Sequence, residues 1–138
     1  MSEPTLALQT AIRSRLIATP AVTALVSADR IIEGPTRPER FPSIIFGSGQ
    51  TVFAGRVHSW RHVWAYLDIH IWTLEGGTEA ARAIANEVDR ALVAPLTVPR
   101  FELLDGNFSV TDARFFRDPD ALHGHGVMSV AALLGEFF

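Results

Sequence analysis

Two carboxylates and two imidazoles fall within eight residues of one another in the stretch RDPDALHGHGVMS, positions 117–129: Asp118, Asp120, His123 and His125. Such groups bind divalent metals, and they also act as general acids and bases. The same stretch holds a proline and two glycines, which are typical of a turn between strands. Its spacing therefore leaves two hypotheses open, a small metal-dependent or acid–base enzyme and a hairpin loop.

The metal hypothesis needs three or four ligands that converge and are supported by further hydrogen bonds. If the last strand began at His123, both histidines would share a face, as a metal site requires. No further His or Glu pattern completes the set, however, because the other three histidines belong to another strand region: His58, His62 and His70. We therefore expect a solvated hairpin loop between strands ending near Arg117 and beginning near Gly126, with no catalytic residue, metal or cofactor.

Composition narrows the class of protein. A chain of 138 residues with 48% hydrophobic and 20% charged residues predicts one folded domain spanning 1–138. It lacks cysteine, so disulfides and thiolate sites are excluded, and no apolar run approaches the ~20 residues that span a bilayer. All 12 basic residues are arginines scattered along the chain, which argues against a basic nucleic-acid-binding stripe.

The segment WRHVWAYLDIHIWTL, residues 60–74, alternates apolar and mixed residues along its length, which predicts a strand with two unlike faces. One face is aliphatic and suits the core: Val63, Ala65, Leu67, Ile69 and Ile71. The other carries all three tryptophans and the only tyrosine. Trp and Tyr bury large areas in protein interfaces, so we expect this second face to contact a partner.

Helical periodicity appears twice, at the N-terminus with Leu8, Ile12 and Leu16 on one side, and at residues 78–94. The remaining strands are expected near residues 30–33 and 43–53, on either side of a turn at Asp105-Gly106, and at the C-terminus. The order predicts an α+β domain, an antiparallel sheet with helices packed on one face. Residues 50–59 are expected to form a projecting hairpin tip that becomes ordered on assembly.

Several segments, taken in order, carry a resemblance to a known family: LALQTAIRSRLIATPAVTALVSADRIIEG, FPSIIFG, LDIHIWT, AARAIANEVDRAL and FFRDPDALHGHGVMSVAALL. Together the chain resembles the small tail-completion, or tail-terminator, proteins of long-tailed phages and gene transfer agent particles. The resemblance implies a structural protein of the virion, not an enzyme. It also implies that the RDPD…HGHG stretch is a hairpin before the last strand.

The resemblance further implies a homo-oligomeric ring of six subunits at the tail–neck junction, assembled in the host cytoplasm. Such a ring would stop growth of the tail tube, contact the major tail tube protein and the neck or head-closure protein, and let DNA pass without sequence-specific binding. We expect the contacts to involve Phe53, Arg56, Val57, His58, Trp60, Trp64, Tyr66 and Trp72. The alternatives are another head–tail connector or head-closure protein, or the enzyme that would use His123, His125, Asp118 and Asp120.

Overall fold

The structure, a computed structural model, describes residues 3–34, 37–57 and 60–137. Helices and strands follow one another in the order α1 (Pro4–Ile17), α2 (Pro20–Thr23), a 3-10 turn η1 (Ala28–Arg30), β1 (Ile31–Glu33), β2 (Ser43–Val57), β3 (Trp60–Leu74), α3 (Glu79–Ala91), β4 (Glu102–Arg117) and β5 (His123–Phe137). Within the described residues, no helix is long and apolar enough to cross a membrane.

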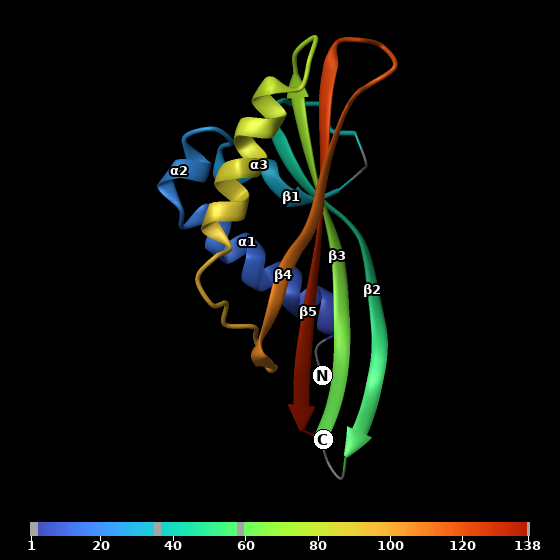
Figure 1. Ribbon diagram of the computed structural model, residues 1–138. Helices are drawn as coiled ribbons and strands as arrows, with labels where there is room; N and C mark the ends of the chain where they lie inside the picture. The colour runs from blue at the N-terminus through green and yellow to red at the C-terminus, as the bar shows by residue number, and fades with distance from the viewer. Residues whose placement is uncertain (1–2, 35–36, 58–59, 138) are drawn as a thin grey trace.

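The strands form one five-stranded sheet in the order β1-β2-β3-β5-β4. The short β1 runs parallel to β2, and the four long strands pair antiparallel with their neighbours. In Figure 1 the long strands form a narrow, twisted sheet, and α1 and α3 lie on one side of it. The predicted α+β class, with helices on one face of a largely antiparallel sheet, is confirmed.

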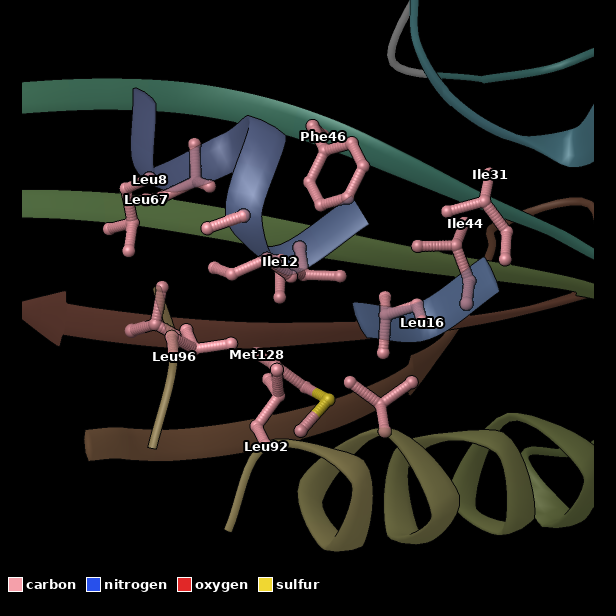
Figure 2. Packing of buried hydrophobic residues seen from close by; sticks show 14 of the residues in the cluster. Leu8, Ile12, Leu16, Ile31, Ile44, Phe46, Leu67, Leu92, Leu96 and Met128 are labelled. Atoms are coloured by element: carbon pink, nitrogen blue, oxygen red, sulfur yellow. The ribbon is translucent and has the colours of Figure 1, made fainter. Parts of the chain in front are cut away.

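The predicted aliphatic face of β3 is the face that the helices cover. Its five members are buried: Val63, Ala65, Leu67, Ile69 and Ile71. Figure 2 shows the opposing stripe of α1, in which Leu8, Ile12 and Leu16 pack over the sheet beside Leu67 and Met128. The core is therefore a single layer of apolar side chains between the helices and one sheet face.

One side chain also ties the two long helices together. Arg15 of α1 donates hydrogen bonds to the carbonyl oxygens of Ala91, Ala94 and Pro95, at distances of 2.8–2.9 Å, where α3 ends. Helix-terminal carbonyls have no partner within their own helix, so the guanidinium satisfies acceptors that would otherwise need water. This contact fixes α1 against the C-terminus of α3.

Two expectations about the strands are wrong. Asp105-Gly106 does not separate two strands, because β4 runs unbroken from Glu102 to Arg117 along β5. The pairing register shifts between Leu103 and Phe108, and Gly106 has a φ of 64°. The Asp-Gly pair therefore forms a bulge within the strand instead of a turn between two strands. Likewise, residues 50–57 are not a hairpin tip but part of β2, paired with β3 to Val57.

Replacing Leu67, which is 3% exposed, with aspartate should unfold the domain, because an unpaired buried carboxylate costs several kcal/mol. A domain of this size has only ~5–15 kcal/mol of stability. Circular dichroism and thermal melting measure the effect. Tyr66→Asp is the matched control, since Tyr66 is the next residue on β3 but is 37% exposed on the opposite face. Normal melting of Leu67→Asp together with unfolding of Tyr66→Asp would mean that the faces are assigned backwards.

Candidate functional site

The RDPD…HGHG stretch is a closed turn between β4 and β5. The Asp118 N–H donates to the His123 carbonyl at 2.9 Å, and the Ala121 N–H donates to the Asp118 carbonyl at 2.9 Å. Ala121 adopts a positive φ of 59°, and the Leu122 N–H donates to Asp120 Oδ1 at 2.8 Å. The hairpin is confirmed, but β5 begins at His123, three residues earlier than expected.

A side chain from a distant segment closes this turn. The Arg37 guanidinium forms ion pairs with Asp118, at 3.1 Å, and with Asp120. Arg37 Nη2 and Asp120 Oδ2 both approach His123 Nδ1, at 2.7 and 2.8 Å. The pKa of Asp120 lies well below its usual range because its carboxylate accepts the Leu122 N–H and contacts His123 and Arg37. The cluster thus holds the Asp120 carboxylate ionised.

The same cluster contains the ligand atoms that the metal hypothesis needs. Those of Asp118, Asp120 and His123 lie within 4.8 Å of one another. The positive charge between the carboxylates is supplied by Arg37, however, so a cation would have to displace a guanidinium that already pairs with both. The arrangement fits a salt-bridged turn better than a metal centre.

His125, the fourth residue of the metal hypothesis, turns away from the cluster. Its ring stacks on Trp72 with centroids 3.8 Å apart, and its Nε2 lies 2.9 Å from Nδ1 of His70. Burial, with a smaller contribution from His70, lowers the pKa of His125 to about 4, and burial also lowers the pKa of His70. Both rings are therefore neutral near pH 7, and the four residues form two separate groups.

Neither histidine of the turn lies in a solvated loop, contrary to expectation, because His123 and His125 are both buried. The segment between β1 and β2 contributes to the burial of His123, whereas Trp72, His70 and Phe116 surround the His125 ring. The Phe41 ring of this segment lies 4.5 Å from the His123 ring, and the Phe41 carbonyl accepts a 2.8 Å hydrogen bond from Arg30. The segment therefore lies against the start of β5, and Arg37 joins it to the β4–β5 turn.

Trp72 is accordingly not a surface residue. It is 3% exposed, and the stacked His125 covers it. Trp72 was expected to contact a partner, but its side chain is buried within the subunit. Alternation along β3 predicted its face correctly but could not show that His125 of β5 covers Trp72 on that face.

The other end of this sheet face remains open. Trp64 and Tyr66 stack with ring centroids 6.3 Å apart and an interplanar angle of 22°, and Val52 lies opposite Trp64 in the register of β2 and β3. Trp60 contacts His62 edge-on nearer the β2–β3 connection. We define the open aromatic face as Val52, Trp60, Trp64 and Tyr66.

Phe53 and Arg56, also expected to make contacts, are exposed on β2. Phe53 lies opposite Val63 in the strand register, and the Arg61 guanidinium is 5.6 Å from the centre of its ring. Phe53 therefore projects on the helix side of the sheet, not on the open aromatic face. His58 and the side chain of Val57 lie outside the described part of the chain.

Arg37 is the residue that sequence reasoning missed. It lies among the prolines of residues 34–42, more than 80 positions before its acidic partners. No periodicity or motif connects segments so far apart. Only the parallel pairing of β1 with β2, which requires a crossing connection, would have indicated that this segment passes over the sheet.

A single α+β domain with one helix-covered sheet face and one partly open aromatic face has the features of an assembly module. Comparison of the sequence with family models identifies the family: residues 10–135 match the model described as "Tail completion protein gp17". The chain belongs to this family, and it is therefore a structural component of a virion and not an enzyme.

Among solved structures, the fold is similar to a chain in "Virion of native gene transfer agent (GTA) particle". The two share 23% sequence identity with a TM-score of 0.82, over 97% of this chain and 99% of the other. Comparison with curated protein sequences finds no significant match. The structural match supports the fold described above.

The paired histidines predict a specific pH dependence. The unfolded chain binds a proton at His125 below its ordinary pKa of ~6.5, whereas the folded chain does so only near pH 4. The free energy of unfolding should therefore fall as the pH drops from 6.5 towards 4, by at most about 1.4 kcal/mol per pH unit for each such histidine.

Denaturant titrations at intervals between pH 7 and 5 measure this slope. His125→Phe keeps an aromatic ring against Trp72 and should reduce the slope, and the additional His70→Phe change should reduce it further. An unchanged slope in the double variant would show that other groups are responsible.

Proposed function

We propose that this protein is a tail terminator: a homo-oligomeric ring, of six subunits, that caps the head-proximal end of the tail tube. The ring stops polymerisation of the tube and joins the tail to the neck. The observation that carries the proposal is the match of residues 10–135 to the tail completion family. The number six comes from the resemblance of the sequence to tail-terminator proteins.

The proposed partners are other copies of the chain, the major tail tube protein and a neck or head-closure protein. Trp and Tyr side chains at the centre of an interface commonly carry much of its binding energy. Trp64 and Tyr66 stand partly exposed on the open aromatic face, so we assign this face to contacts within the assembly. The family description favours tail completion over a head-closure role.

The charge of the chain suits a ring that DNA crosses. The net charge is −3, and a surface without a concentrated basic patch attracts the phosphate backbone weakly. DNA would therefore pass through the ring without being retained. The similar fold found in a gene transfer agent virion supports a place in such a particle, at the junction of tail and neck.

Deletion of the gene should leave tail tubes of uncontrolled length and separate DNA-filled heads, because nothing would then stop the tube or bind the neck. Electron microscopy of the deletion strain measures both effects. Complementation with the native gene should restore uniform tails, whereas Trp64→Ala should restore fewer. Tails of normal length attached to heads in the deletion strain would contradict the proposed function.

A further inference from the structure

Both edges of the sheet offer unpaired backbone. In the part of the chain that the structure describes, no strand pairs with β2 on its outer side beyond Phe46, nor with β4 on its outer side. Soluble proteins normally protect long edges with charged residues, proline or short strands. Residues 47–55 of β2 contain no charged residue and no proline. This edge therefore lacks the charged residues and proline that commonly prevent pairing with another strand.

The directions of the strands show which strand would fit. The four long strands alternate in direction across the sheet in the order β2, β3, β5, β4. A second copy placed beside the first in the same orientation would set its β2 antiparallel to β4. Repetition of this step around a closed ring would continue one antiparallel sheet through all the subunits, leaving no free β2 or β4 edge.

The side chains at these two edges are complementary on the helix side of the sheet. Phe53 is 68% exposed on the β2 side. On the β4 side, α3 and the sheet enclose a groove of about 450 Å³, whose floor includes Val110, Phe115 and Met128. Arg82 stands over the Phe115 ring at 5.2 Å. The groove thus offers an apolar floor to an aromatic side chain that has little cover in its own subunit.

Charge is complementary as well. Asp89 of α3 and Asp112 of β4 lie at the groove, and Arg56 follows Phe53 on β2 with its side chain exposed. A neighbour that brings Phe53 to the groove brings Arg56 towards the Asp89 carboxylate on the helix side of the sheet, whereas the Asp112 carboxylate pairs with Arg114 on the other face. Like-charged edges would instead oppose the approach of the neighbouring subunit.

We propose that the outer edge of β2, residues 47–57, pairs antiparallel with the outer edge of β4 in a second copy, so that Phe53 packs in the groove between α3 and β4. The inference rests on the proposed ring and assigns its subunit contact. Closure of the ring requires the strands to tilt, and the resulting offset between neighbouring subunits sets which residues of β2 and β4 pair. The open aromatic face is then left for the other components of the particle.

Cysteine cross-linking tests the pairing, and the chain has no native cysteine. Val52→Cys on β2 is combined in turn with Glu102→Cys, Ser109→Cys or Arg114→Cys, all at exposed positions of β4. Purified tails that carry each variant are treated with a short bifunctional maleimide. At least one double variant should give a ladder of products up to the complete ring, whereas each single variant should stay monomeric.

Rings seen by electron microscopy without a ladder from any double variant would overturn the pairing and leave the proposed function intact. Efficient dimers from a single β4 cysteine would also overturn it, since they would indicate two-fold pairing of β4 with β4. Tails without a ring would contradict the proposed function itself.

A substitution of Phe53 tests the proposed contact of its side chain with the groove. Phe53→Ala should leave the circular dichroism of the free subunit unchanged and weaken incorporation into tails at least about tenfold, as expected of an aromatic anchor. Leu74→Ala is the matched control, because Leu74 is 69% exposed at the far end of β3. Equal incorporation of both variants would exclude Phe53 from the contact.

Discussion

The two-residue period of β3 is the constraint on which the rest of the structure depends. This strand is bonded to β2 on one side and to β5 on the other along nearly its whole length. A slip of one residue in its register would exchange its two faces, placing Asp68 and His70 under the helices and Leu67 and Ile69 in the open. The apolar stripes of α1 and α3 can pack on only one of these faces, so the alternation selects the fold.

The open face is itself divided into two parts. At one end His125 covers Trp72, and Arg37 holds the segment between β1 and β2 to the β4–β5 turn. At the other end Trp64 and Tyr66 stay partly exposed. In Figure 1 the β2–β3 hairpin continues well beyond the helices at this second end. The first end stabilises the subunit, and the second is the part of the face that we propose contacts other components of the particle.

Hydrophobic periodicity in the sequence predicted the two long helices and the faces of β3. The stripe of α1, the helix at residues 79–91 and both faces of β3 follow from periodicity and were confirmed. Asp105-Gly106 has the composition of a turn, but pairing with the long β5 overrides that preference. Because β4 stays paired with β5 on both sides of Gly106, the positive φ there produces a bulge and not a reversal of the chain.

The contacts that decided the candidate site were not predictable from local patterns. Arg37 meets Asp118 and Asp120 across more than 80 residues, and the stacking of His125 on Trp72 depends on the register between β5 and β3. Spacing in the sequence placed four possible metal ligands together, whereas Arg37 gathers Asp118, Asp120 and His123, and the ring of His125 packs on Trp72 and His70. Contacts between distant segments, and not the spacing of the four residues in the sequence, therefore determine what these side chains do.

Hydrogen–deuterium exchange on the free subunit and on purified tails tests the central claim, that this domain assembles through its free strand edges. The outward-facing amides of residues 47–57 and of β4 should exchange quickly in the free subunit and become protected in tails. The amides of β3 serve as an internal control, because neighbouring strands already bond them on both sides. Equal exchange at both edges in the two states, with new protection confined to α1 and α3, would contradict the claim.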